Sequence, residues 1–177
     1  RKTTASNFYQ TGFVQFQANA GLYFLVNLAS DNQKLEQELK ASLYLLGEEG
    51  LGGERSSGAG RFTPHWSNLS SEWEKLIKFN QNSHYSLLSL YWQNSLPQNL
   101  MSDTTSYQVE SRGGWASSPF SGQQLLRKKV RMFSEGSVFP ISPKGELADV
   151  TPLNFNLHKI YRNGISMSLP IQLQQES

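Results

Sequence analysis

A glycine-rich segment that follows a helical pattern is the feature that most constrains this chain. Six of its fourteen glycines lie within residues 47–60, together with the sequence Arg-Ser-Ser at 55–57. Glycine allows positive φ and close backbone approach, and successive backbone N–H groups can form an anion-binding concavity. Serine hydroxyls add donors, and Arg55 or Arg61 can form two hydrogen bonds to one phosphate. The segment predicts a cradle for phosphate or an RNA backbone; the alternative is a flexible connection, for which six glycines would be entropically costly.

The spacing of these glycines excludes the common nucleotide motifs. A Walker loop would need lysine directly after Gly58, where this chain has Ala59. The third glycine position of a dinucleotide fingerprint beginning at Gly50 is occupied by Arg55. Neither a triphosphate loop nor a dinucleotide loop is therefore expected, and no cofactor is predicted.

The hydrophobic patterning predicts an α+β fold in which strands outweigh helices. Leucines at 35, 39, 43 and 46 recur on one helical face, with Ser30 as the N-cap and Gly47 as the C-cap. Residues 71–78 predict a short second helix, and the polar residues around it indicate a boundary between two units. The strand patterns are apolar and rich in β-branched or aromatic residues. They cover 13–16, 21–28, 61–66, 84–92, 106–112, 125–133, 135–140 and 159–171.

The charge is balanced overall but not along the chain. Sixteen Lys and Arg residues stand against fourteen Asp and Glu residues. Residues 111–134 include no acid, and their five bases are Arg112, Arg127, Lys128, Lys129 and Arg131. Such a patch attracts phosphates by releasing condensed counterions. The alternative is a solvated strand or loop whose counter-charges lie elsewhere.

The sequence is poor in catalytic and metal-binding patterns. It has no cysteine, which excludes disulfides, thiolate metal sites and a cysteine nucleophile, and is compatible with a reducing cytoplasm. His65, His84 and His158 lie far apart and lack metal-ligand spacing. No apolar run approaches the ~18 residues of a membrane span. These observations favour a binding protein that is not an enzyme, with no metal and no membrane partner.

Several segments together carry a resemblance to a known family. Residues 45–62 resemble the glycine-rich loop of CRISPR-associated RAMP proteins. The segments 86–91, 112–115, 127–139 and 158–164 follow in the order expected of one RAMP family, subunit four of the type III-A Csm effector complex. The loop marks the superfamily, whereas the Arg-Lys-Lys and Glu-Gly-Ser sequences within 127–139 indicate the narrower family. Members are considerably longer, so we expect this chain to begin part-way through the first unit.

The resemblance implies a ferredoxin-like (RRM-like) α+β fold in two units. Residues 1–68 would be the C-terminal part of the first unit, with the glycine-rich loop, and residues 80–177 would form a second, degenerate, strand-rich unit. The implied function is a non-catalytic cap at the foot of the complex that holds the 5′ repeat-derived tag of the CRISPR RNA. The implied partners are that RNA, the large polymerase-like Cas subunit and a backbone RAMP subunit, in the cytoplasm.

RNA contacts are expected from the loop and from the basic segment. The resemblance assigns the loop to the RNA backbone, and charge alone assigns the basic residues. The predicted RNA-binding set is Gly52, Gly53, Arg55, Ser56, Ser57, Gly58, Gly60, Arg61, Lys128, Lys129 and Arg131. Trp115 is a candidate for base stacking, with a place in the core as the alternative.

Two other functions stay open at this point. A RAMP endoribonuclease that processes CRISPR repeat RNA would use His65 or His84 as its general base, because imidazole titrates in the useful range. A purely structural subunit would instead dock a neighbouring protein through the glycine-rich loop.

Overall fold

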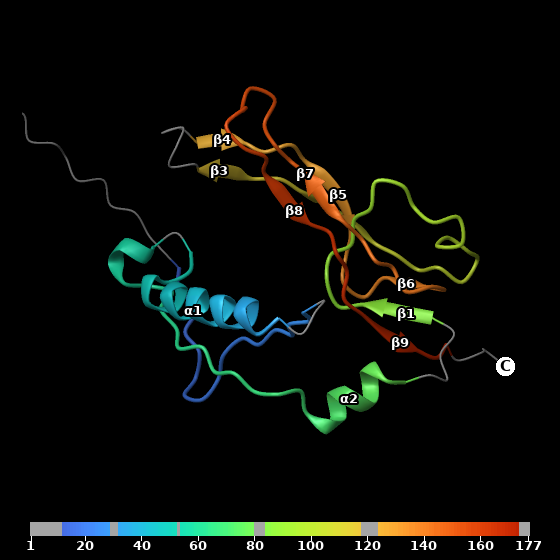
Figure 1. Cartoon of the computed structure of the whole chain (residues 1–177), viewed down its shortest axis with the longest axis horizontal. Coiled ribbons are helices and arrows are strands. Elements are labelled where there is room, and N and C mark those ends of the chain that lie inside the picture. Colours follow the sequence, from blue (N-terminus) through green and yellow to red (C-terminus); the bar gives the residue numbers. More distant parts are fainter. Residues whose placement is uncertain (1–11, 29–31, 53, 80–83, 118–123, 174–177) are drawn as a thin grey trace, which may run out of the picture. The chain divides into compact units, whose positions relative to one another are not determined.

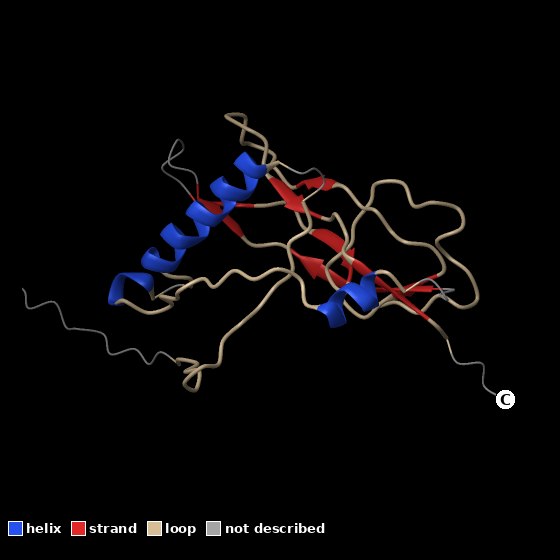
Figure 2. Ribbon diagram, turned by 60° about the horizontal axis from the view of Figure 1, so that its bottom comes forward, coloured by secondary structure: helices blue, strands red, loops and turns tan. Residues whose placement is uncertain are grey.

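The computed structural model describes residues 12–28, 32–52, 54–79, 84–117 and 124–173. The chain divides into two compact units, Arg1–Trp66 and Ser67–Ser177. The first unit contains a long helix, and the second contains a short helix with several small antiparallel sheets (Figure 1; Figure 2). The protein is therefore of mixed helix and sheet structure, and the polar segment expected at the boundary belongs to the second unit.

The long helix α1 (Gln33–Glu49) confirms the predicted helical pattern but differs from the prediction at its start. Its N-cap is Asn32, whose side-chain oxygen accepts the N–H of Leu35 at 3.1 Å. The prediction of Ser30 as the N-cap is wrong, and Ser30 itself lies outside the described residues. Asparagine caps a helix about as well as serine does, so a polar cluster before the helix offers several candidate caps.

Gly47 lies inside α1, which corrects its predicted role as the C-cap; the helix ends at Gly50 instead. Gly47 is buried, and its carbonyl accepts the N–H of Phe62 at 3.1 Å. A Cβ on residue 47 would overlap the carbonyl of Phe62. The glycine thus lets the segment after the loop cross the helix closely, a role that glycine's lack of a side chain permits.

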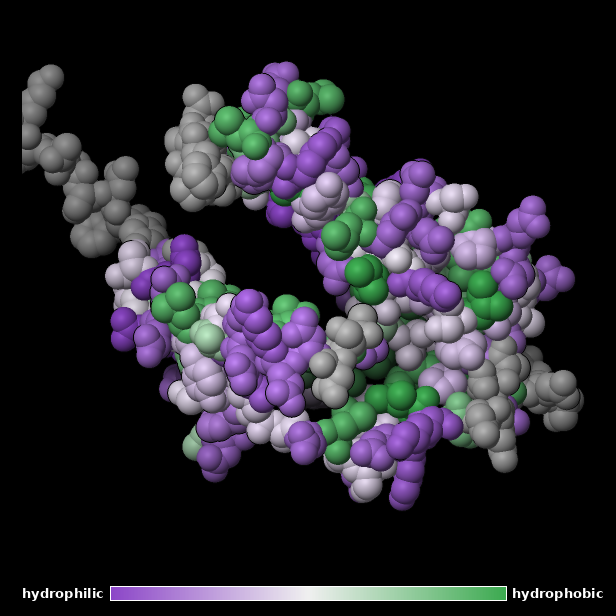
Figure 3. Space-filling model, viewed as in Figure 1, coloured by the Kyte–Doolittle hydropathy of each residue, from purple (hydrophilic) through white to green (hydrophobic). Residues whose placement is uncertain are grey.

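Residues 12–28 and 61–66 contain no strand, although strands were predicted in both. Large apolar side chains of the first segment are exposed, with Leu22 at 87% and Tyr23 at 80%. Apolar residues lie among polar ones on the visible surface (Figure 3). Branched and aromatic residues raise strand propensity, but a ladder also needs a partner backbone. Within the described residues, neither segment has such a partner.

The short helix α2 (Ser71–Ile77) confirms the second helical prediction. Ser70 is its N-cap and accepts the N–H of Trp73 at 3.4 Å. Two glutamates occupy the first turn, where the helix dipole favours negative charge.

The main sheet of the second unit has three antiparallel strands in the order β6–β1–β9. They are β1 (His84–Leu87), β6 (Val138–Phe139) and β9 (Ser168–Ile171). Tyr85 in the central strand stands opposite Phe139 on one side and Pro170 on the other. Proline is tolerated at that position because β9 is an edge strand.

Two-stranded antiparallel sheets complete the described part of this unit. The pairs are β2 (Val109–Arg112) with β5 (Val130–Phe133), β3 (Trp115–Ser117) with β4 (Gln124–Leu126), and β7 (Leu147–Asp149) with β8 (Tyr161–Asn163). Strands β2, β4, β5 and β8 lie in or overlap predicted strand segments. Strands β3 and β7 were not predicted.

The core of the second unit is built from side chains in three parts of the sequence: Leu87 with Tyr91, then Leu100, then Phe139. The Tyr91 ring stacks on Phe133 at a centroid distance of 5.5 Å, and Phe139 meets Phe133 edge-on at 5.3 Å. Such aromatic pairs add stabilisation beyond the burial of their surface. Because Phe133 ends β5, this packing anchors the strand that carries part of the basic segment.

Candidate functional site

The glycine-rich loop is closed at its base by two glycines. The N–H of Leu51 donates to the carbonyl of Gly60 at 2.9 Å. Gly50 and Gly60 have φ of 87° and 76°, values that residues with a Cβ rarely adopt. A Cβ at Gly60 would overlap the Leu51 backbone, and one at Gly50 would lie 2.6 Å from the carbonyl oxygen of Ala59. The crossing of the chain over itself therefore requires both glycines.

The tip of the loop is a 3-10 turn, η1 (Arg55–Ser57), that uses several of its own donors. The N–H groups of Ser57 and Ala59 donate to the Glu54 carbonyl at 3.1 and 3.2 Å. The N–H of Gly58 donates to the Arg55 carbonyl at 2.9 Å. The Ser57 hydroxyl also donates to the Glu54 carbonyl, at 2.8 Å. These groups stabilise the turn, so the predicted role of Ser57 as a donor to RNA competes with an internal hydrogen bond.

Other parts of the loop are open to solvent. Gly52 and Gly58 have φ of 101° and 85°, and a Cβ on either would meet no atom within 4 Å. The side chains of Arg55 and Ser56 are exposed. Gly53, another predicted RNA-binding residue, lies outside the described residues. The loop thus presents accessible backbone next to a guanidinium group and a hydroxyl group.

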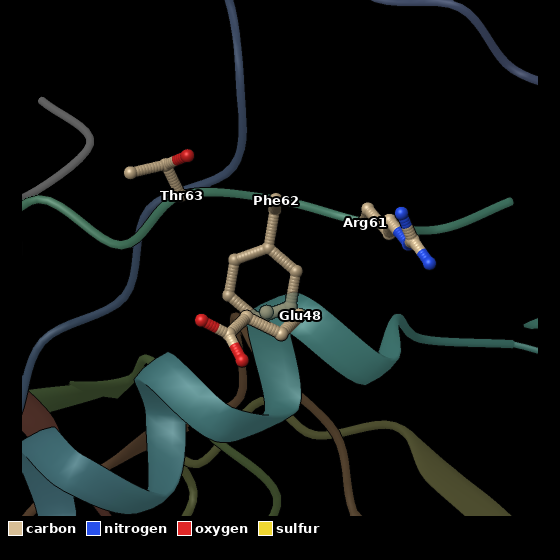
Figure 4. Close-up of a pocket in the computed structure, with 5 residues that line it drawn as sticks. Glu48, Arg61, Phe62 and Thr63 are labelled. Atoms are coloured by element: carbon tan, nitrogen blue, oxygen red, sulfur yellow. The ribbon is translucent and has the colours of Figure 1, made fainter. Parts of the chain in front are cut away.

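A pocket of about 550 Å³ lies where the segment after the loop crosses the end of α1. Its lining residues are Gly47, Glu48, Arg61, Phe62 and Thr63. In Figure 4 the Phe62 ring points toward the helix with the Glu48 carboxylate beside it, whereas the Arg61 guanidinium points away from that carboxylate. Because Glu48 repels a phosphate, the interior of the pocket is a poor phosphate site. The Arg61 side chain is exposed to solvent.

The basic segment of the second unit lies between β4 and the end of β5. Its backbone is held by the N–H of Lys128, which donates to the carbonyl of Val150 at 3.1 Å. The side chains of Lys128, Lys129 and Arg131 are exposed. Met132, the next residue of β5, is 1% exposed, so its side chain and that of Arg131 lie on opposite faces of the strand. A fixed backbone therefore projects three cations into solvent.

The predicted RNA-binding residues fall into two groups, one in each unit. The loop group carries Arg55 and Arg61 but also three glutamates, Glu48, Glu49 and Glu54. The basic segment contains no acidic residue. Electrostatic attraction to a polyanion is accordingly stronger at the basic segment, and the loop offers backbone groups and shape.

The positions of Trp115 and the three histidines bear on the predictions of base stacking, general-base catalysis and metal binding. Trp115 in β3 is 64% exposed, so it does not occupy the core. His84 is buried in β1 with its Nε2 2.7 Å from Thr104 Oγ1, and His65 belongs to the other unit. His158 Nδ1 lies 3.1 Å from the carbonyl oxygen of Lys159. In the described part of the chain, no three His, Asp or Glu side chains cluster as metal ligands would.

Sequence reasoning missed Arg162, which lies in β8. Its Nη2 donates to the carbonyl of Gly113 at 3.0 Å, and Nη2 of Arg127 donates to the same oxygen at 3.4 Å. Burial lowers the pKa of Arg162, and the positive charges of Arg127 and Arg112 lower it further. Arg162 lies far from the acid-free segment in sequence, so charge patterning along the chain does not reveal this neighbourhood.

Comparison with known proteins places the second unit in a family. Residues 80–171 match the sequence model described as the CRISPR Csm4 C-terminal domain. The chain belongs to the Csm4 family. The resemblance drawn from the sequence to subunit four of the Csm complex is thereby confirmed.

Relatives of this Csm4-family chain come from archaea and bacteria and carry the name CRISPR system Cms protein Csm4. A Methanocaldococcus jannaschii protein is 24% identical over 99% of this chain and 50% of its own length. A Streptococcus thermophilus protein is 30% identical over 84% of this chain and 48% of its own length. A Mycobacterium tuberculosis protein is 29% identical over 81% of this chain and 45% of its own length. The chain spans about half the length of these curated relatives.

Neither α1 nor α2 is both long and apolar enough to cross a membrane.

Proposed function

We propose that this Csm4-family chain is a non-catalytic RNA-binding subunit of a type III-A Csm effector complex. In this proposal it caps the foot of the complex and holds the 5′ repeat-derived tag of the CRISPR RNA. Its partners are that RNA, the large polymerase-like Cas subunit and a backbone RAMP subunit, in the cytoplasm. The proposal includes a ferredoxin-like RAMP fold, to which the small antiparallel sheets of the second unit would belong.

The observation that carries the proposal is the exposed, acid-free basic segment. Lys128, Lys129 and Arg131 project into solvent from a backbone that is fixed by the Val150 hydrogen bond and by the packing of β5. Cations held in place in this way neutralise phosphates and release counterions without first having to order a flexible chain. In this proposal the polyanion is the CRISPR RNA strand, because the chain belongs to a CRISPR protein family.

The glycine-rich loop supplies the second set of RNA contacts in this proposal. The open backbone at Gly52 and Gly58 allows a sugar-phosphate chain to approach closely, and Arg55 can form a forked pair with a phosphate. Ser56 adds an exposed hydroxyl at the tip. Gly60 contributes by closing the loop, so its role in binding is indirect.

The proposal assigns no chemical step to the chain. A general base must reach the proton that it abstracts and be positioned by neighbouring groups. His84 is buried and hydrogen-bonded to Thr104, so its imidazole is poorly placed to take a proton from a substrate. This placement supports binding over cleavage at His84. Metal-independent cleavage of repeat RNA by excess protein in single-turnover conditions would contradict the proposal and favour an endoribonuclease.

The test is RNA binding by the full chain, followed as a function of salt. Changing Lys128 and Lys129 together to Ala should weaken binding of tagged CRISPR RNA. The same change should flatten the dependence of log K on log salt by about 0.7 for each phosphate that the variant no longer neutralises. The matched control is Lys144→Ala, which removes an exposed lysine of the same unit outside the basic segment. Equal affinity and equal salt slope for all three proteins would contradict the role of the basic segment.

A further inference from the structure

Three arginines from separate segments converge on the bend between β2 and β3. The carbonyl of Gly113 accepts hydrogen bonds from Nη2 of Arg162 at 3.0 Å and from Nη2 of Arg127 at 3.4 Å. The next carbonyl, that of Gly114, accepts Nε of Arg127 at 3.4 Å and its backbone N–H at 3.0 Å. The bend thus holds two guanidinium groups against one oxygen, and both groups are positioned by the backbone.

The third guanidinium belongs to Arg112, the last residue of β2. Its Nη2 pairs with Oε2 of Glu110 at 2.5 Å, and its side chain is 41% exposed. Its Nε is buried and has no hydrogen-bond partner in the described part of the chain. A buried donor without a partner is rare, because it gives up its hydration and receives nothing in return. Because protein atoms enclose this Nε, the part of Arg112 that a ligand can reach is the 41% of its side chain that is exposed.

Basic side chains lie directly against the two glycines of the bend. A Cβ at Gly114, which has φ of 117°, would lie 3.0 Å from Nη2 of Arg127. A Cβ at Gly113 would lie 3.2 Å from Cγ of Lys129, so the lysine stem runs over the bend. The two glycines therefore allow cations to gather closely around one short stretch of backbone.

The positive charge of this cluster is not neutralised within the described residues. One carboxylate, that of Glu110, forms an ion pair with the cluster in the described residues, whereas the cluster contains three guanidinium groups. The mutual repulsion is visible at Arg162, whose pKa is lowered by burial and by the charges of Arg127 and Arg112. Like charges brought together in a partly buried place raise the free energy of the folded state. An anion bound between them would remove that penalty.

We propose that Arg112, Arg127 and Arg162 form a binding site for one phosphate group of an RNA strand. Guanidinium groups suit this ligand because their forked donors match phosphate oxygens. The hydrogen bonds described above occupy only part of the five donors that each guanidinium carries. This site rests on the proposed RNA-binding function and adds a specific phosphate contact outside the exposed Lys128, Lys129 and Arg131.

An RNA phosphate fits the surroundings better than a free phosphate ion. Trp115 follows the bend directly in sequence and is 64% exposed. Single-stranded nucleic acid is bound by pairing cationic groups with aromatic rings on which bases stack. The cluster therefore combines the two elements of such a site.

The experiment compares the full chain with Arg112→Lys and Arg162→Lys, using a single-stranded RNA oligonucleotide and inorganic pyrophosphate as probes. Each substitution keeps the charge but removes the fork, so RNA affinity should fall about tenfold or more in variants that thermal unfolding shows to be folded. Lys144→Gln is the control and should bind RNA as the wild-type chain does. RNA affinity that is unchanged in both arginine variants would overturn the site while leaving the proposed function intact.

Glu110→Gln is the variant that decides the matter if the arginine variants fail to fold. Glu110 competes with the ligand for Arg112, so its removal should raise the affinity for RNA several-fold. A purely structural cluster would instead be destabilised without any rise in affinity, and that result would overturn the proposal. Binding of poly-glutamate as tight as that of RNA would also overturn it, in favour of an acidic protein surface.

The pyrophosphate arm separates this inference from the proposed function. If the wild-type chain binds no RNA, the proposed function fails, and the site is then judged by pyrophosphate alone. Thermal stabilisation of the wild-type chain by pyrophosphate that is absent in Arg112→Lys supports a phosphate site. An equal effect on both chains, or none on either, overturns it.

Discussion

Replacing Gly60 by alanine should open the base of the glycine-rich loop, whereas the same change at Gly58 should leave the base closed. Both glycines have positive φ, of 76° and 85°. They differ in their surroundings, because a Cβ at Gly60 would overlap the backbone of Leu51, and one at Gly58 would stand in open space. The pair therefore separates the cost of backbone conformation from the cost of a steric clash.

The expected magnitudes follow from this geometry. Holding an alanine in the left-handed region costs about 1–2 kcal/mol, and this is the whole expected cost at Gly58. At Gly60 the methyl group also forces apart the two chains joined by the 2.9 Å hydrogen bond from Leu51 N–H. Breaking that bond adds about 0.5–1.5 kcal/mol, and the clash adds to it, which brings the expected cost at Gly60 to about 2–4 kcal/mol.

The measurement is amide hydrogen exchange at Leu51, which reports the closing hydrogen bond directly. Protection of this amide should fall roughly thirtyfold or more in Gly60→Ala, since each 1.4 kcal/mol corresponds to about a factor of ten. In Gly58→Ala the same amide should keep most of its protection. Equal reduction of protection in the two variants would refute the steric reasoning, and full protection in Gly60→Ala would refute the described crossing of the loop.

Three further predictions concern the scaffold. Leu100→Ala removes a fully buried core side chain and should destabilise the second unit by about 2–5 kcal/mol in urea unfolding; a smaller destabilisation would mean that the core is not packed as described. Hydrogen bonds from Lys159 and Thr151 hold the pKa of Asp149 below its usual range. The stability they contribute is present above the unfolded pKa of about 3.9 and is lost as pH falls through the lower folded value, so Asp149→Asn should flatten acid unfolding below about pH 4; an unchanged acid-unfolding profile would contradict this role. Asn32→Ala should reduce the helical circular dichroism signal and cost about 1 kcal/mol because the Leu35 N–H is left without its acceptor; an unchanged signal and stability would contradict the cap.

The helices could be predicted from the sequence because their signals are local. The leucine stripe of α1 is a pattern within a few turns, and each helix needs only its own backbone to form its hydrogen bonds. The strands of the second unit were recognised where branched or aromatic residues run together. Strands β3 and β7 are three residues long, too short for a periodicity to be visible.

Residues 12–28 show where the local signal misleads. Their run of branched and aromatic residues has the composition of a buried strand, yet Leu22 is 87% exposed and no ladder forms there within the described residues. Strand propensity measures how well side chains fit a pleated, half-buried surface, and that surface must be supplied by a neighbour. The pattern therefore indicated side chains that suit a half-buried sheet surface, but it could not indicate whether a partner strand is present.

In the candidate site too, features that are local in sequence could be predicted, and contacts between distant residues could not. The acid-free run at 111–134 is visible in the sequence because charge counts need no fold. The convergence of Arg162 on the Gly113 carbonyl is not visible, because the two residues are 49 positions apart in sequence and meet only in the fold. The glycines of the loop show the same limit, since composition cannot distinguish Gly60, which a chain crossing requires, from Gly52, which faces open space. A glycine count therefore overstates how much of a loop is available to a ligand, and RNA contacts should be sought first at Gly52 and Gly58, where substitution changes the accessible surface without disturbing the closure.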